Sequence, residues 1–267
     1  MARRLALLAA ALVAAPSPAS SASSAGPPPI AHEYPVDLAI TAAAVATWTA
    51  TELAKPALAP ARCRWCEPGA LDAAVREAAV WSTPARARRA SDVLAFALLP
   101  AGIATHQLLA AGRAGSTREG AVDLLAVAQA AALTADLTLA VKYAVVRRRP
   151  AALHAGPDAA RGPDDDLSFF SGHTSFAFSL VAAAGTVSTV RGYPSAPWVW
   201  GAGAALAAGT GWLRVAGDAH WLTDVLAGAA AGTAMGIAIP RLLHRREAGP
   251  AAGQPLGAPT IGIALPF

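Results

Sequence analysis

The sequence predicts an all-α protein: a six-helix membrane-embedded bundle with its functional site at one end, preceded by a signal-like leader. Hydrophobic residues make up 55% of the 267-residue chain and charged residues only 14%, whereas soluble domains carry about a quarter charged residues. Six apolar stretches have lengths that suit helices spanning, or nearly spanning, a bilayer. Strand-like alternation does not compete with them before the last residues. Together these observations favour a membrane protein.

The leader, residues 1–25, has the outline of a secretory signal peptide. Two arginines precede an apolar run over residues 5–15, and small residues follow over 19–25. The run is too short to cross a bilayer, which needs about 20 residues. An uncleaved short anchor is the alternative. Residues 26–35 are then expected to form a linker.

A helical domain is expected over residues 36–240. Its apolar stretches are rich in Ala, Thr and Gly, and small residues allow helices to approach closely in lipid. A short amphipathic helix is expected around residues 71–81, and a basic, then Pro/Gly-rich tail over 241–267. One short extended segment could end that tail. The six stretches cover approximately residues 36–55, 91–111, 120–146, 173–190, 197–214 and 219–240.

The two cysteines of the chain, Cys63 and Cys66, lie in a loop after the first stretch. A lone CxxC without a second ligand pair is weak evidence for zinc. Its surroundings do not have the βαβ pattern of a thioredoxin-like redox motif. If the chain is exported, a local disulfide is the plain interpretation, and unpaired thiols are the alternative.

The third apolar stretch ends in VKYAVVRRRP. Lys142 and Arg149 are seven residues apart, or two helical turns, so we expect them on one face of a helix that Pro150 stops. Cations at a membrane edge can also simply extend to the interface. This segment alone therefore does not indicate a function.

The fourth stretch begins in FSGHTS. Ser171 and Gly172 lead into a helix whose first N–H groups lack internal partners, and such an end binds anions readily. His173 would lie beside a phosphate held there. The structural alternative is a capped helix start that happens to carry a histidine.

The fifth stretch ends, and the sixth begins, in WLRVAGDAHWLTD. Following Arg214, His220 and Asp224 are four residues apart and are expected on one face of a helix that Gly217 and Asp218 begin. A carboxylate can accept one ring proton and leave the other ring nitrogen free. Charged groups in or beside spans usually mark function, so we expect the three segments to converge on one oxyanion. The other histidines, at 32, 106, 154 and 244, lack comparable neighbours.

Together the three segments resemble the three signatures of the type 2 phosphatidic acid phosphatase and vanadium haloperoxidase superfamily. They occur in the expected order, the match covers about residues 90–240, and the membrane lipid-phosphate phosphatase branch fits best. Two positions depart from the pattern. Phe170 stands where many members have Pro, and Leu213 where many have Ser. Neither position carries the chemistry, so these departures affect fine substrate preference.

The resemblance implies a phosphoric monoester hydrolase that works through a phosphohistidine. His220 would attack phosphorus, Asp224 would orient it, and His173 would protonate the leaving group and then activate water. A bell-shaped pH–rate profile is expected from the two histidines. Neither a cofactor nor a metal is expected, because side-chain cations supply the positive charge. The Asp164–Asp166 run lacks a matching ligand cluster and is expected to be a solvated loop. The expected phosphate-binding residues are Lys142, Arg149, Ser171, Gly172 and Arg214.

The expected substrate is a lipid phosphate or an isoprenyl pyrophosphate, and the expected partner is the membrane. Nucleic acid is not expected, because the chain lacks a basic stripe with interleaved aromatics. An exported soluble acid phosphatase and a vanadate-dependent haloperoxidase are the alternatives within the superfamily. A small transporter or lipid-binding protein would place polar residues near helix centres, whereas the cations here fall at helix ends.

Two observations disagree about which side of the membrane carries the site. A disulfide would place the cysteine loop, and the site at the same end, in the periplasm. A cleaved signal followed by six spans would put that end in the cytoplasm. Either the leader is not processed in this way, the first stretch does not cross, or the domain is soluble and periplasmic. We expect a bacterial-type cell membrane with the site facing the periplasm.

Overall fold

The computed structural model describes residues 26–156 and 160–246, and within these ranges it contains helices and loops without a β-strand. The predicted signal peptide over residues 1–25 and most of the predicted tail lie outside the described residues. The predicted linker overlaps the first two residues of the first helix, which begins at Tyr34. The elements are α1 (Tyr34–Leu58), α2 (Ala70–Ala79), α3 (Pro84–Val93), η1 (Leu94–Leu98), α4 (Leu99–Arg113), α5 (Thr117–Val145), α6 (Pro150–Leu153), α7 (Gly172–Val190), α8 (Ala196–Ala216) and α9 (Leu222–Leu243).

Among the described residues, three helices are long and apolar enough to cross a membrane: Pro84–Arg113, Thr117–Val145 and Leu222–Leu243. Large apolar side chains also point outward from other helices. Leu53 on α1 is 79% exposed and Trp198 on α8 is 76% exposed. Such outward apolar groups suit a lipid surface better than water. A fully embedded bundle of six spanning helices stays a prediction.

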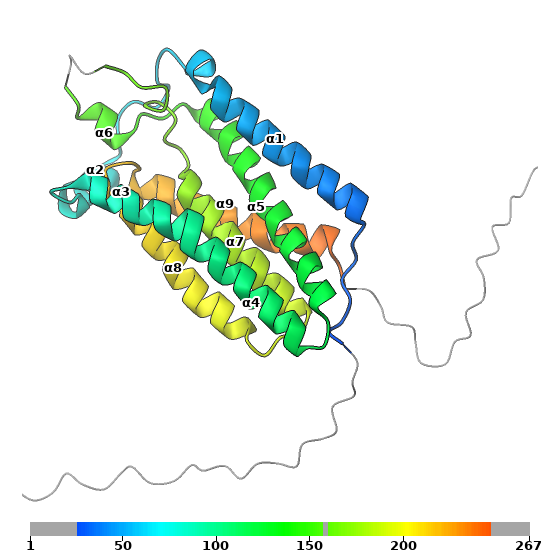
Figure 1. Ribbon diagram of the computed structural model, residues 1–267. Helices are drawn as coiled ribbons and strands as arrows, with labels where there is room; N and C mark the ends of the chain where they lie inside the picture. Colours follow the sequence, from blue (N-terminus) through cyan, green and yellow to red (C-terminus); the bar gives the residue numbers. More distant parts are fainter. Residues whose placement is uncertain (1–25, 157–159, 247–267) are drawn as a thin grey trace, which may run out of the picture.

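Helix α7 is the central element of the bundle. It packs against α5, α8 and α9, and more lightly against α4 (Figure 1). The Ser171 side chain caps its start by accepting a hydrogen bond from the Thr174 N–H, which satisfies one of the free donors of the first turn. The helix therefore begins at a fixed residue, and that residue immediately precedes His173.

Helices α7 and α9 are in contact backbone to backbone. Gly228, Gly232 and Gly236 follow one another at every fourth position of α9, on the face toward α7. A Cβ added at Gly232 would lie only 2.2 Å from the Ser175 carbonyl oxygen. Small residues at this spacing permit such close approach in lipid. The contact fixes the two helices whose first turns carry His173 and Asp224.

The segment Pro84–Arg113 is one continuous helix that contains a π-helical turn, Leu94–Leu98. Pro100 lies just after that turn. A proline has no N–H to donate, and its ring crowds the carbonyl four residues earlier. A π turn in this position relieves the conflict without ending the helix. The helix therefore continues, and its first half reaches the end of the bundle at which α7 begins.

A loop with a disulfide covers that end. Cys63 and Cys66 are disulfide-bonded, with their Cα atoms 5.3 Å apart. Between them, Trp65 pairs with Arg147 in an isolated parallel β-bridge. Helix α2 follows the loop, close to the predicted residues 71–81. The cysteine loop and the start of α9 thus lie at the same end of the bundle (Figure 1).

Candidate active site

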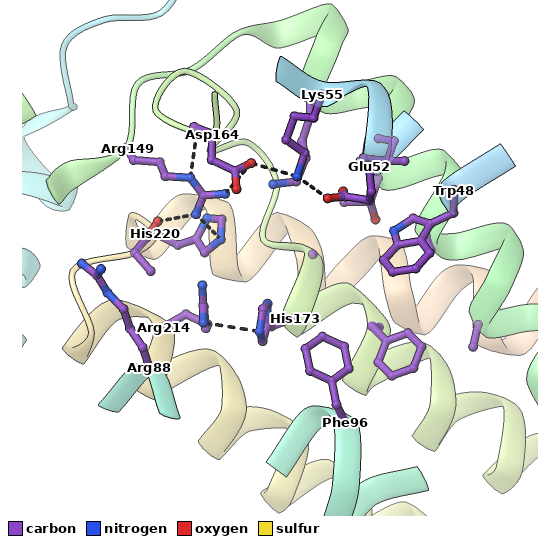
Figure 2. A pocket seen from close by; sticks show the side chains of 18 of the residues that line it. Trp48, Glu52, Lys55, Arg88, Phe96, Arg149, Asp164, His173, Arg214 and His220 are labelled. Carbon is purple, nitrogen blue, oxygen red and sulfur yellow. Dashed lines mark hydrogen bonds and ion pairs between the residues drawn. The ribbon is translucent and has the colours of Figure 1, made fainter. Parts of the chain in front are cut away.

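A cavity of about 800 Å³ opens at this end of the bundle. The three segments singled out in the sequence converge on it, together with side chains from α1 and α3. In Figure 2, Arg149, Arg214 and the two histidines lie on one side, and Trp48 and Phe96 lie on the other. The lining includes the predicted residues Lys142, Arg149, Gly172, His173, Arg214 and His220.

The first segment reaches the cavity differently from the prediction. Lys142 and Arg149 do not share a helical face, because α5 ends at Val145. Val146 adopts a left-handed conformation with φ 52° and its N–H is bonded to the Lys142 carbonyl. The chain then leaves the helix axis, and Pro150 begins the short helix α6 instead of stopping α5.

Both cations still line the cavity, each held by backbone carbonyls. The Lys142 Nζ donates to the Leu167 carbonyl at 2.7 Å. Arg149 donates through Nε to the Asp164 carbonyl at 2.8 Å and through Nη1 to the Ala219 carbonyl at 3.0 Å. Burial lowers the pKa of Arg149, and neighbouring carboxylates oppose this shift. The guanidinium is therefore held in a fixed place at the wall of the cavity.

The pairing of His220 with Asp224 was predicted from a shared helical face, and that reason is wrong. His220 precedes α9, which starts at Leu222. The Asp224 carboxylate folds back to accept the Trp221 N–H at 3.0 Å, as an acidic group does in a capping box. This return places Asp224 Oδ2 3.5 Å from His220 Nδ1.

The predicted start of α9 at Gly217 and Asp218 is also wrong. Gly217 ends α8 as its C-cap. Asp218 has φ 54°, and it accepts two hydrogen bonds from the Arg76 guanidinium at 2.7 and 2.9 Å. The turn from Gly217 to Trp221 is therefore a tight loop, and His220 projects from this loop.

The hydrogen bonds of His220 identify which ring nitrogen is unprotonated. The Nε2 atom lies 3.1 Å from Arg149 Nη1, and arginine can only donate. The Nε2 must therefore accept, so the ring proton is on Nδ1, on the Asp224 side. Burial lowers the pKa of His220 well below 6.5, and Arg149 and Lys142 lower it further. The ring is thus neutral at pH 7, with its lone pair toward the cations.

His173 lies in the first turn of α7, outside the three helices that are long enough to cross. Its Nε2 is 2.7 Å from Asp92 Oδ1 and 3.4 Å from Arg214 Nη1. Phe96 packs edge-on against the ring. Burial and the Arg214 charge lower the pKa of His173 to about 4, although Asp92 acts in the opposite direction. This ring is therefore also neutral at pH 7.

Sequence reasoning missed Asp92, which comes from α3. Its carboxylate also accepts from Arg214 at 3.2 Å, and the neighbouring Ser91 hydroxyl accepts from the same nitrogen at 3.0 Å. Both residues are the first two of the predicted apolar stretch 91–111. That position is the only local signal that could have indicated them.

The two small residues before His173 have different surroundings. Gly172 lines the cavity. The Ser171 side chain is fully buried, and its oxygen accepts from the Thr174 hydroxyl at 2.9 Å as well as from the Thr174 N–H. The Ser171 hydroxyl is thus engaged in the helix cap, and its predicted contact with phosphate stays a prediction.

Two further charged groups at the cavity were also missed. Lys55, near the end of α1, pairs with Glu52 and lies 3.1 Å from Asp164 Oδ1. Asp164 is also 3.7 Å from Arg149. Burial tends to raise the pKa of Asp164, but Arg149 and Lys55 together outweigh it and lower that pKa. The predicted solvated loop is wrong at Asp166, which is buried.

Comparison with known families finds a match over the part of the chain that contains the three segments. The sequence model of the PAP2 superfamily matches residues 123–248. This segment belongs to the PAP2 superfamily. The resemblance inferred from the three motifs is thereby confirmed, and the match contains the three segments that meet at the cavity.

The chain was also compared with solved structures and with curated proteins. A transmembrane PAP2-type phosphatidylglycerolphosphate phosphatase from Bacillus subtilis is similar in structure, with a TM-score of 0.46 and 18% identity. The similarity covers 76% of this chain and 93% of that chain. None of the curated proteins matches the sequence.

Proposed function

We propose that this PAP2 protein is a metal-independent phosphatase that hydrolyses a lipid phosphate or an isoprenyl pyrophosphate through a phosphohistidine. The observation that carries the proposal is the setting of His220. Its Nδ1 faces the Asp224 carboxylate and its Nε2 faces Arg149 inside the cavity. A neutral imidazole with one nitrogen held and the other beside a cation is suited to attack an anionic phosphoryl group.

In the first step, His220 Nε2 attacks phosphorus in line. The P–N bond forms as the P–O bond to the leaving group breaks, and His173 gives its proton to the departing oxygen. Asp224 stabilises the positive charge that develops on the His220 ring. Lys142, Arg149 and Arg214 hold the phosphoryl oxygens, and such positioned cations stabilise charge in the transition state.

In the second step, water attacks phosphorus and gives a proton to His173. The P–N bond breaks, its electron pair returns to Nε2, and inorganic phosphate leaves. The low pKa of His173 fits this cycle. A bound phosphate dianion favours the charged form of a nearby imidazole, so His173 gains its proton together with the substrate.

The apolar part of the cavity supports a lipid as the substrate. This part extends from the cations between α1, α5 and α7, away from the loops. A chain of methylene groups buried there would gain about 0.8 kcal/mol per group. The apolar lining includes Val45, Trp48, Phe96, Ala131, Leu139, Phe176 and Leu180.

The disulfide supports a site that faces the periplasm, because disulfides persist in oxidising compartments. Trp65, between the two cysteines, is bridged to Arg147 of the first motif, so the loop and the site lie on one side. A membrane-impermeant thiol reagent, applied to intact cells after mild reduction, should label Cys63 and Cys66. Labelling only after lysis would place the site in the cytoplasm, and release of the protein by osmotic shock would rule out a membrane protein.

The activity is tested by phosphate release from purified protein in detergent, across phosphatidate, phosphatidylglycerophosphate and an isoprenyl pyrophosphate. His220→Ala should lower turnover by at least about 10³-fold, because it removes the nucleophile. His106→Ala is the matched control. This histidine lies on α4, outside the cavity lining, and bonds to the Ser195 hydroxyl at 2.7 Å. Turnover that survives in His220→Ala would reject the nucleophile.

A trapping experiment tests the intermediate. Substrate labelled with ³²P and quenched during turnover should leave label on the protein that is stable to base and lost in acid, as a phosphohistidine is. With a substrate whose leaving group needs little protonation, the first step should survive in His173→Ala. This variant should then retain more label than wild type, because the water that hydrolyses the phosphohistidine lacks its base. Label that persists in His220→Ala would place the covalent step elsewhere.

A further inference from the structure

Arg147 lies behind the catalytic pair, buried to 1% exposure. It is the first of three consecutive arginines in the first motif. Its Nη1 donates to Asp224 Oδ1 at 2.5 Å, and its Nη2 donates to Asp72 Oδ2 at 2.6 Å. One guanidinium therefore bridges two carboxylates that are themselves buried, and a planar fork is suited to this task.

The segment between α1 and α3 holds Arg147 from the other side. The Trp65 ring lies over the guanidinium, with its centroid 3.7 Å from Cζ, which is cation–π geometry. The Trp65 carbonyl accepts from the Arg148 N–H at 3.0 Å. Asp72 also accepts from the Thr223 N–H at 2.9 Å and from the Thr223 hydroxyl at 2.7 Å, at the start of α9.

We propose that Arg147 is a positioning residue for the phosphoryl transfer, holding the Asp224 carboxylate against His220 while Trp65 and Asp72 hold Arg147. The inference rests on the proposed function. Asp224 Oδ2 accepts from the Ser168 hydroxyl at 2.6 Å and faces His220 Nδ1 at 3.5 Å. The other oxygen, Oδ1, accepts a hydrogen bond from Arg147. The guanidinium therefore fixes the rotation of the Asp224 carboxylate about its Cβ–Cγ bond.

The charge of Arg147 matters as well as its shape. His220 is faced by Arg149, Lys142, Arg214 and His173, and Asp224 is the carboxylate beside it. Arg147 offsets part of the Asp224 charge. Without Arg147, a less compensated carboxylate should favour the protonated form of His220, which cannot attack. A purely structural arginine would leave the titration of His220 unchanged.

The test is the double variant Arg147→Gln/Asp72→Asn, which removes one charge of each sign from the buried cluster. Per folded molecule, kcat should fall about 10- to 100-fold, as expected for a misplaced catalytic group, while KM stays within about threefold because the phosphate-binding cations remain. The acid limb of the pH–rate profile should move to higher pH. The matched control is Arg148→Gln/Asp166→Asn, which removes the neighbouring ion pair at 2.9 Å and should leave kcat and the limb unchanged.

Two results would overturn the inference: an unchanged kcat and acid limb in the Arg147 variant, or an equal loss in the control. If the double variant does not fold, Arg147→Lys decides. Its single ammonium cannot bridge both carboxylates, so kcat should fall at least about tenfold, and wild-type kcat would overturn the inference.

An NMR titration of protein with ¹⁵N-labelled histidine separates this inference from the proposed function. His220 should take up its proton at higher pH in the double variant, whether or not any ester is hydrolysed. If wild type releases no phosphate, the proposed function fails, and the titration still decides the role of Arg147. Identical His220 titrations in wild type and variant would refute that role.

Discussion

Replacing Gly232 by alanine tests whether the contact between α7 and α9 sets the geometry of the site. The added Cβ would lie 2.2 Å from the Ser175 carbonyl oxygen, about 1.2 Å short of the 3.4 Å at which ordinary van der Waals contact begins. The atom in the way is a backbone oxygen, so a side-chain rotation cannot relieve the clash. The helices must separate by about 1 Å, and overpacking of this kind costs about 1–3 kcal/mol.

The separation should reach the chemistry, because α7 carries His173 and α9 begins beside His220. A misplacement of about 1 Å can lower the rate about 100-fold. We therefore expect Gly232→Ala to lower kcat/KM for phosphate release by roughly that factor and to lower the melting temperature. Both are measured on purified protein, by a phosphate assay and by a thermal unfolding scan.

Gly209→Ala on α8 is the matched control, because a Cβ there would meet no atom of the described residues within 4 Å. It should keep full activity and gain up to about 1 kcal/mol from the better helix propensity of alanine. If Gly232→Ala behaves like Gly209→Ala in both assays, the backbone contact does not set the site geometry.

Two further predictions concern charge and pH. The pKa of His220 is lowered well below 6.5 in the folded state, so the unfolded chain binds the proton more readily. The free energy of unfolding should therefore fall as the pH drops below 6.5, by about 1.4 kcal/mol per pH unit for this group. Unfolding scans of wild type and His220→Gln at several pH values test this, and equal slopes would contradict it. Asp164→Asn removes the carboxylate near Arg149 and Lys55. Inorganic phosphate should then inhibit turnover at several-fold lower concentration, and an unchanged inhibition constant would show that Asp164 does not compete with phosphate.

The sequence predicted the helices and the convergence of the three segments, because both depend on strong local signals. Long apolar stretches bounded by loops predict helices. His173, Arg214 and His220 each lie at or near one end of such a stretch, and ends of neighbouring helices tend to meet. Five of the predicted side chains, and Gly172 with them, therefore line one cavity.

The details that failed depend on choices of the backbone that side-chain spacing does not determine. Val146 takes a left-handed conformation that few β-branched residues adopt, so Arg149 could not be placed by counting helical turns. Asp224 returns to cap its own helix, so its four-residue spacing from His220 had another cause.

Residues from distant segments could not be predicted at all. Asp92, Lys55 and Asp72 belong to separate helices, and their roles arise only when these helices pack. Arg147 carries the same charge as the next two residues, and only its buried position distinguishes it. Chemistry of this kind depends on contacts that are long-range in sequence.

The π turn at Leu94–Leu98 separates two helical registers. Ahead of it, Asp92 faces His173; behind it, Leu99 and Ile103 pack in the core. A π turn accommodates one residue more than an α turn, and each residue rotates a helix by about 100°. Loss of a single residue here would leave the apolar face of α4 seated while turning Asp92 away from the imidazole. The length of this turn, independent of its composition, thus sets whether His173, the proposed acid–base group, keeps its contact with the Asp92 carboxylate.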